Sequence, residues 1–156
     1  MQVIGVDHTS YTVSNLERSL EFYTRLLGLE LLWQREIDTP YFCEILGFPN
    51  CLVRAAHLRI PGSQHKVELF EYVQPIGQKA DVRTLNVGSS HLSLLVEDLH
   101  AAYAELKARG VEFRSPPVEI TAGVNRGGWA VYLLDPDGIT VELFQQPARE
   151  TQREPD

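Results

Sequence analysis

Apolar and polar residues follow the same succession of patterns in two separate parts of the chain. In each part, a short run with strand-like alternation precedes apolar residues spaced three and four positions apart, which indicates an amphipathic helix. The first helix is expected from about Asn15 to Leu27, and the second from about Asp98 to Arg109. Asn15 and Asp98 have side chains suited to cap the first turn of a helix. The pattern therefore predicts a strand followed by a helix in both parts.

The residues of the two parts also match. A histidine lies in the first strand-like run of each part, and these two residues, His8 and His91, are 83 positions apart. The tetrapeptide Val-Glu-Leu-Phe occurs at residues 67–70 and again at 141–144, an offset of 74. Matching strands at unequal offsets are expected of a repeated unit whose loops differ in length. The chain therefore reads as one unit present twice.

Each part has room for two more strands between its helix and its tetrapeptide. They are expected at about Glu30 to Glu36 and Leu52 to Ile60, and at about Glu112 to Arg114 and Trp129 to Leu134. The apolar residues 1–6 lack the basic segment of a signal peptide and are interpreted as the first strand. The order of one strand, one helix and three strands predicts an α+β fold. Two tandem βαβββ modules with curved mixed sheets would form a cleft.

The expected organisation is a single domain followed by a tail. Its parts are module one at residues 1–73, a linker at 74–87, module two at 88–147 and a flexible tail at 148–156. Within module one, the segment from Thr39 to Pro49 is an apolar excursion. We expect it to form a short helix that lids a pocket.

Composition and charge exclude several classes of function. The 156 residues are 44% hydrophobic, which is enough for an ordinary packed core. The formal net charge of −7 argues against sequence-independent binding of nucleic acid and against an anionic membrane surface. No apolar stretch is long enough to cross a membrane. The two cysteines, Cys43 and Cys51, form no CxxC motif, so we expect reduced thiols in a cytoplasmic protein.

The repeated residues carry the candidate chemistry. Strand side chains alternate between faces, so the apolar neighbours of His91 and Glu142 would face the helix and these two residues the cleft. His8 and Glu68 repeat that arrangement in the first part. Two imidazole nitrogens and two carboxylates suit one borderline divalent ion, namely Ni, Co, Zn, Mn or Fe. We expect these four residues to bind it and to leave open positions for a substrate.

The same residues also have a plainer, structural interpretation. A single strand histidine usually has a structural hydrogen bond, and a single strand glutamate usually lies on a solvated face. The occurrence of both at matching places in both parts favours metal binding instead. His57, His65 and His100 have no counterpart in the other part and are expected at the surface, with His57 a candidate for the pocket.

The chain resembles a known family, the vicinal-oxygen-chelate superfamily. The resemblance rests on the two strand–helix segments that begin with histidine, and on Asp135-Pro136-Asp137-Gly138 leading to Glu142. The superfamily contains glyoxalase I, methylmalonyl-CoA epimerase, extradiol dioxygenases, and fosfomycin- and bleomycin-resistance proteins. The four expected ligands resemble the His-Glu-His-Glu set of glyoxalase I. One fold serves all these reactions, so the resemblance indicates the fold more sharply than the reaction.

The resemblance implies a metal-dependent lyase or isomerase of the glyoxalase I type. A metal ion would act as a Lewis acid on two adjacent oxygens of a small substrate, through an enediolate-type intermediate. Glu142 or Glu68 would remove the substrate proton. Members of the superfamily form their sites within one chain or between two, and we expect a homodimer.

Two departures from the family pattern affect the expected substrate. Thr12 stands where glyoxalase I has an arginine that helps to hold glutathione, so glutathione is not the expected substrate. Epimerases have a catalytic glutamate before a proline on the third strand, and the segment from Ala55 to Pro61 has no carboxylate. His57 lies in that segment and is the residue that could replace it.

Two alternative functions remain open from the sequence. The extradiol dioxygenase signature ends in a tyrosine, Asp-Pro-x-Gly and a glutamate, which Tyr132 and Glu142 match, but Asn125 stands where its acid–base histidine belongs. A non-catalytic protein that binds a small molecule, such as an antibiotic, is the other alternative. The loop that holds Asn125 also offers Arg126, which could reach an anionic substrate. Asn125, Arg126, Tyr132 and His57 are therefore the expected substrate-binding residues.

Overall fold

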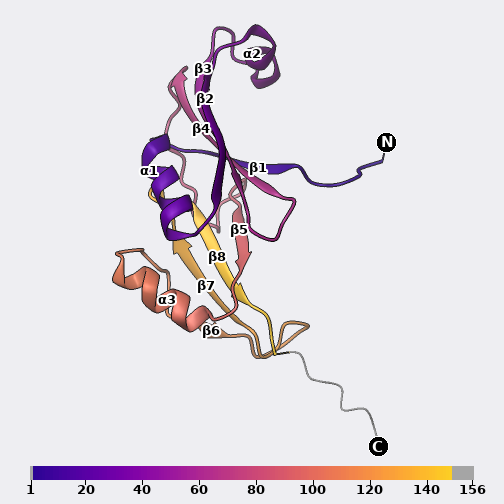
Figure 1. The fold of residues 1–156 in the computed structure, drawn as a ribbon, viewed down its shortest axis with the longest axis vertical. Coiled ribbons are helices and arrows are strands. Elements are labelled where there is room, and N and C mark those ends of the chain that lie inside the picture. Colours follow the sequence, from indigo (N-terminus) through magenta and orange to yellow (C-terminus); the bar gives the residue numbers. More distant parts are fainter. Residues whose placement is uncertain (1, 149–156) are drawn as a thin grey trace, which may run out of the picture. The chain divides into compact units, whose positions relative to one another are not determined.

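The structure is a computed structural model that describes residues 2–148 (Figure 1). The chain divides into two compact units between Ala80 and Asp81. The tail expected at residues 149–156 lies outside the described residues.

Unit one is a four-stranded mixed sheet with helices. Its elements are β1 (His8–Thr12), α1 (Leu16–Leu20), the π-helical turn η1 (Glu21–Leu26), β2 (Glu30–Ile37), α2 (Pro40–Leu46), β3 (Leu52–Arg59) and β4 (Lys66–Gln74). The strand order is β1-β4-β3-β2, in which β1 runs parallel to β4 and the other pairs are antiparallel. α1 lies against β3 and β4, and the first and last strands of the unit, β1 and β4, are neighbours in the sheet.

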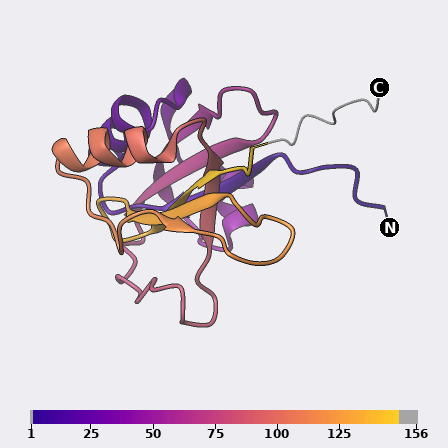
Figure 2. The same cartoon turned by 90° about the horizontal axis from the view of Figure 1, so that it is seen from below.

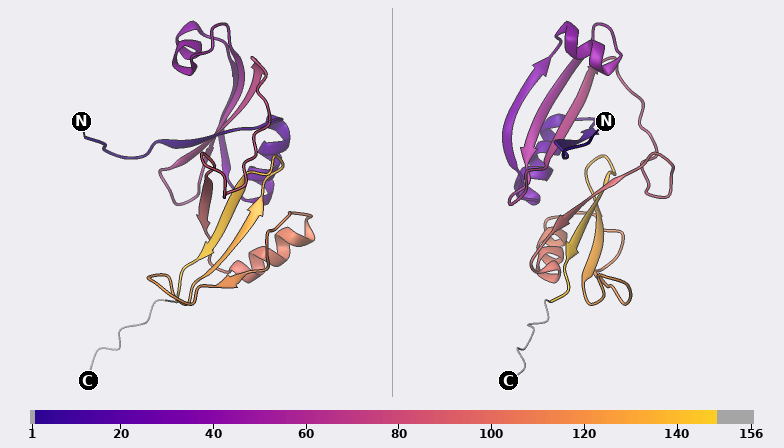
Figure 3. Two further views of the ribbon diagram at one scale, coloured as in Figure 1. Left: turned by 180° about the vertical axis from the view of Figure 1, so that it is seen from behind. Right: turned by 90° about the vertical axis from the view of Figure 1, so that its right-hand side faces the viewer.

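Unit two repeats this topology. Its elements are β5 (His91–Leu95), α3 (Leu99–Ala108), β6 (Val118–Glu119), β7 (Trp129–Leu134) and β8 (Thr140–Gln145). The order β5-β8-β7-β6, with β5 parallel to β8, matches that of unit one. α3 lies on one side of this sheet and contacts β8 (Figures 2 and 3). The prediction of an α+β fold with two βαβββ modules is confirmed.

The helix starts are fixed by two kinds of capping contact. The side chains of Asn15 and Asp98 accept hydrogen bonds from the first-turn amides, as the sequence predicted. The sequence did not predict a second contact. The amide of Leu16 donates to Glu71 Oε2 at 2.7 Å, and that of Leu99 donates to Gln145 Oε1 at 2.8 Å. Each helix is therefore attached to the central strand that holds the repeated tetrapeptide.

Two expected strands are wrong. The segment 112–114 makes only an isolated bridge, from Phe113 to Leu133, and the short edge strand of unit two is β6. Pro116 and Pro117 follow this segment, and proline has no amide hydrogen to continue a ladder. Residues 2–7 also form no strand, and β1 begins only at His8, because its parallel partner β4 begins at Lys66.

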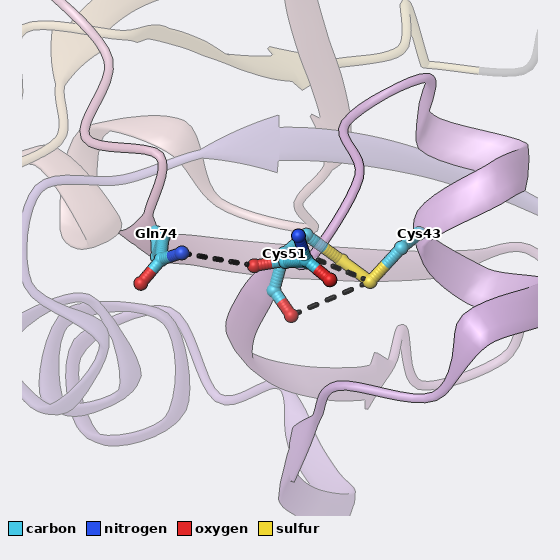
Figure 4. Close-up of a disulfide and its surroundings, with 4 residues drawn as sticks. Cys43, Cys51 and Gln74 are labelled. Atoms are coloured by element: carbon cyan, nitrogen blue, oxygen red, sulfur yellow. Dashed lines mark hydrogen bonds between the residues drawn. A yellow bond between two sulfur atoms is a disulfide. The ribbon is translucent and has the colours of Figure 1, made fainter.

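The expectation of reduced thiols is also wrong. Cys43 in α2 and Cys51, just before β3, form a disulfide (Figure 4). The amide of Cys51 donates to Cys43 Sγ at 3.1 Å, and the Gln74 side chain donates to the carbonyl of Asn50 at 3.2 Å. Sequence spacing could not show this contact, because it depends on how the turn after α2 folds back. The disulfide fastens α2 to the sheet of unit one.

We expect reduction of this disulfide to lower the stability of the protein. Closing a loop of this length restricts the unfolded chain and contributes about 2.5 kcal/mol. The variant with Cys43→Ser and Cys51→Ser should unfold at correspondingly lower denaturant concentration, as should the wild type in reducing agent. The oxidised protein, denatured without reductant, should show no titratable thiol. Two free thiols per chain, with no effect of reductant on unfolding, would contradict the disulfide.

Candidate metal centre

The first half of the candidate centre lies on unit one. Glu68 is the register partner of Ser10, so His8 is two residues away along the parallel strand and lies on the same face. His8 Nε2 and Glu68 Oε2 are 3.5 Å apart. The neighbours Val67 and Leu69 are fully buried on the opposite face of the strand. The Glu68 side chain is itself only 11% exposed. The sheet face that carries His8 and Glu68, opposite α1, is called the ligand face below.

The second half repeats this geometry on unit two. Glu142 pairs with Ser93, and His91 again lies two residues before that partner. His91 Nε2 and Glu142 Oε2 are 3.4 Å apart, and the Glu142 side chain is 20% exposed. The two units therefore present the same pair of side chains in the same register.

The spacing of each pair suits a metal ion. Neighbouring ligand atoms that each lie about 2.1 Å from one ion are about 3.0 Å apart in octahedral coordination, which leaves two positions open beside four protein ligands, and about 3.4 Å apart in tetrahedral coordination. The Nε2–Oε2 separations of 3.5 Å and 3.4 Å are close to this range, and are longer than a strong charge-assisted hydrogen bond. Among residues 2–148, no three His, Cys, Asp or Glu side chains form a complete metal cluster. That all four residues bind one ion stays a prediction.

Asp7 orients the His8 ring, which the sequence analysis missed. Asp7 Oδ2 lies 2.8 Å from His8 Nδ1, and because a carboxylate only accepts, Nδ1 carries the hydrogen. With its hydrogen on Nδ1, the neutral form of the ring has its lone pair on Nε2, the nitrogen that lies toward Glu68, and this is the form that binds metal. The hydrogen bonds from His8 and then from Lys66 lower the pKa of Asp7 to about 2. The signal in the sequence was an aspartate directly before the first histidine.

The residues opposite the two glutamates differ between the units. His57 on β3 pairs with Glu68, and its Nε2 lies 2.7 Å from Glu68 Oε1. Tyr132 on β7 pairs with Glu142, and its ring centre lies 5.1 Å from that of His91. Burial, and then the charge of Glu142, raise the pKa of Tyr132. The His57 side chain is 13% exposed, so it is not at the surface, and its expected contact with a substrate stays a prediction, as does that of Tyr132.

The ligand face of unit one continues into an apolar cluster under α2. Ile37, Val53, Ala55, Phe70 and the disulfide form its buried part, with Trp33, Phe42, Leu46 and Tyr72 packed against it. Phe70 lies two residues after Glu68 on the same face of β4, so the apolar cluster borders the carboxylate. Burial, and then the charge of Glu68, raise the pKa of Tyr72. The predicted short helix is confirmed as α2. Its role as a lid stays a prediction.

The remaining candidates lie apart from these pairs. His65 is partly buried, with Nε2 2.9 Å from Thr9 Oγ1, and exposed His100 lies against Trp129. Asn125 and Arg126 are exposed in the loop between β6 and β7, and their substrate contacts remain untested. That loop is fixed at its end by Gly128, since a Cβ there would stand 2.7 Å from the carbonyl of Gln145.

The sequence is similar to those of known proteins. The sequence model of the Glyoxalase/Bleomycin resistance protein/Dioxygenase superfamily matches residues 5–143. A 2-epi-5-epi-valiolone epimerase of Actinomyces sp is 34% identical over 149 residues, covering 93% of this chain and 81% of that protein. A lactoylglutathione lyase of Escherichia coli O157:H7 is 28% identical over 141 residues, covering 89% and 90%. The chain spans only 43% of lactoylglutathione lyase GLX1 of Arabidopsis thaliana, which is 26% identical over 142 residues.

A similar fold occurs in a solved structure. A glyoxalase family protein from Bacillus cereus superposes with a TM-score of 0.79 at 21% identity, covering 95% of this chain and 97% of that one. This likeness supports the fold described above. In the described part of the chain, no helix has the length and apolar character needed to cross a membrane.

We expect removal of the Asp7 carboxylate to weaken binding of a divalent ion. Asp7→Ala frees the His8 ring to rotate and to change tautomer, and losses of this kind weaken metal binding about tenfold to a hundredfold. The dissociation constant should be measured by competition with a chromophoric chelator. Asp81→Ala is the matched control, because it removes an exposed aspartate paired with Arg83 in the other unit. Equal affinities of the two variants would refute the role given to Asp7.

Proposed function

Because the chain belongs to the Glyoxalase/Bleomycin resistance protein/Dioxygenase superfamily, we propose that it is a divalent-metal-dependent lyase or isomerase. Its substrate is a small molecule with two adjacent oxygens. His8, Glu68, His91 and Glu142 bind the ion, within one chain or between the chains of a homodimer.

The repeated His–Glu pair is the observation that carries this proposal. A glutamate between two buried aliphatic residues is unfavourable unless it is paired or bound to a cation. This unfavourable placement occurs twice, each time with an imidazole nitrogen about 3.5 Å from the carboxylate. Structural need alone does not explain why both units keep the same two side chains at the same register.

The donor set also fits the chemistry of the relatives. When bound, a borderline divalent ion supplies Lewis acidity to carbonyl and hydroxyl oxygens. The chain's own contribution is a carboxylate that removes a proton from the carbon next to a carbonyl group, after which a second donor, such as a water molecule, delivers a proton to the opposite face of that carbon. An epimerase must move such a proton to invert a stereocentre. We favour this reaction because the epimerase relative shares 34% of its aligned residues. Residues 55–61 lack the glutamate expected of the epimerases named above, so the base in this proposal is a glutamate of the His–Glu pairs.

A hydroxylated ketone or aldehyde is the substrate class we propose. Thr12 stands where a glutathione-binding arginine is expected in glyoxalase I, which argues against a glutathione adduct. The apolar cluster beside Glu68 supplies a wall that excludes water from one side of the reacting carbon. The cytoplasmic location stays a prediction, and the disulfide is the feature that bears against it.

The sequence motif that suggested a ring-cleaving dioxygenase has a structural explanation. Asp135 is 4% exposed, and its Oδ1 accepts hydrogen bonds from the amides of Asp137 and Ile139 at 2.8 Å. These contacts close the turn that leads into β8. The motif is therefore needed to fold the turn that sets the position of Glu142.

We expect one divalent ion per chain in protein purified without chelator, measured by elemental analysis. Glu142→Ala should lose most of this ion, because a protein carboxylate contributes both charge and a ligand. Glu105→Ala, which removes an exposed glutamate of α3, is the control and should keep the ion.

The same preparations should be incubated with hydroxy ketones in deuterated water. The metal-loaded wild type should exchange the hydrogen next to the carbonyl for deuterium, while Glu142→Ala should not. Protein that never binds a divalent ion, or a Glu142→Ala variant that binds it as tightly as the wild type, would refute the proposal.

A further inference from the structure

We propose that His57 is a positioning residue that fixes Glu68 as a permanent ligand and leaves Glu142 as the more mobile carboxylate. This inference rests on the proposed function and assigns different tasks to its two glutamates. It follows from one difference between two otherwise matching units, namely the side chain that lies opposite each glutamate.

The two oxygens of Glu68 have different neighbours. His57 Nε2 lies 2.7 Å from Oε1, whereas His8 Nε2 lies 3.5 Å from Oε2. Because the carboxylate only accepts hydrogen bonds, Nε2 of His57 carries a hydrogen and is the donor. A nitrogen that carries a hydrogen toward Glu68 has no lone pair for an ion. His57 Nε2 is therefore not a ligand for an ion bound by Glu68, and Oε2 is the oxygen of Glu68 that is left for one.

The His57 ring is itself held in place. Trp33, its cross-strand partner on β2, stacks on it with ring centres 4.3 Å apart and planes at 25°. The Arg35 guanidinium lies 4.6 Å from the Trp33 ring centre. With side-chain exposures of 13% and 11%, His57 and Glu68 are largely shielded from water, which strengthens their hydrogen bond. Both the donor and its orientation are thus fixed by packing.

Unit two lacks this support. Tyr132 occupies the position equivalent to His57, but no side-chain hydrogen bond joins Tyr132 to Glu142 in the described part of the chain. The Glu142 side chain is also more exposed than that of Glu68, 20% against 11%. Of the two carboxylates, Glu142 is the one that can move toward a substrate and accept the proton from its carbon.

The decisive experiment compares metal affinities of variants at the two equivalent positions. His57→Phe keeps an aromatic ring against Trp33 and removes the donor, so the dissociation constant of Co²⁺ or Zn²⁺ should rise at least about tenfold. Tyr132→Phe is the matched control and should change the constant less than about twofold, since Tyr132 holds no ligand oxygen. His57→Gln retains a donor and should recover part of the affinity. Thermal unfolding without metal checks that each variant folds.

The outcomes separate this inference from the proposed function. If the wild type binds one ion and His57→Phe binds it equally well, His57 does not position Glu68 and the inference is overturned while the proposed function stands. The same holds if Tyr132→Phe weakens binding as much as His57→Phe. If the wild type binds no ion, both fail. A selective loss in His57→Phe, partly recovered by His57→Gln, supports the inference, because a role in packing alone would not depend on the donor.

Discussion

Parallel pairing of the first and last strands of each unit is the constraint on which the candidate centre depends. In both units, the glutamate of the last strand pairs with a serine two residues beyond the histidine of the first strand. A shift of one residue in this pairing would turn the glutamate to the helix side of the sheet and break the His–Glu pair. The register of this pairing therefore determines whether the repeated residues can form the proposed metal site.

The same two central strands also hold the helices in place. Glu71 and Gln145 follow the glutamates of β4 and β8 by three positions, so they point to the opposite face and accept hydrogen bonds from the first helical amides. Glu71 further contacts Arg54, which reaches Glu17 of α1. Each central strand thus carries a candidate ligand on one face and a helix anchor on the other. This double use explains why the tetrapeptide and the residue after it recur so closely.

Local patterns predicted much of this fold. Helix periodicity and capping residues located α1 and α3, and the bounds of β7 were predicted without error. Elements that depend on a distant partner were predicted less well. Residues 2–7 have the apolar character of a strand, but β4, the strand that pairs with β1, does not extend back far enough to pair with them. The segment at 112–114 precedes two prolines. The disulfide depends on a turn whose path is not encoded in the spacing of Cys43 and Cys51.

The candidate site was likewise predicted where the signal is local and missed where it depends on distant partners. Repetition within one sequence was enough to select His8, Glu68, His91 and Glu142, because the same two residue types at matching positions in both units are not expected by chance. Contacts that modify these residues were not visible. His57 reaches Glu68 and Trp33 only through the pairing of β2, β3 and β4, so its partners could not be read from neighbouring residues. The asymmetry between the two glutamates came from the structure alone.

The central claim is that both His–Glu pairs bind the same ion. Pulsed electron paramagnetic resonance of the protein loaded with one equivalent of Cu²⁺ counts the imidazole nitrogens that bind a single ion. The account predicts two coordinated imidazoles, falling to one in His8→Ala and to one in His91→Ala. A single imidazole in the wild-type spectrum, unchanged when either His8 or His91 is replaced, would show that the pairs do not share an ion and would contradict the account.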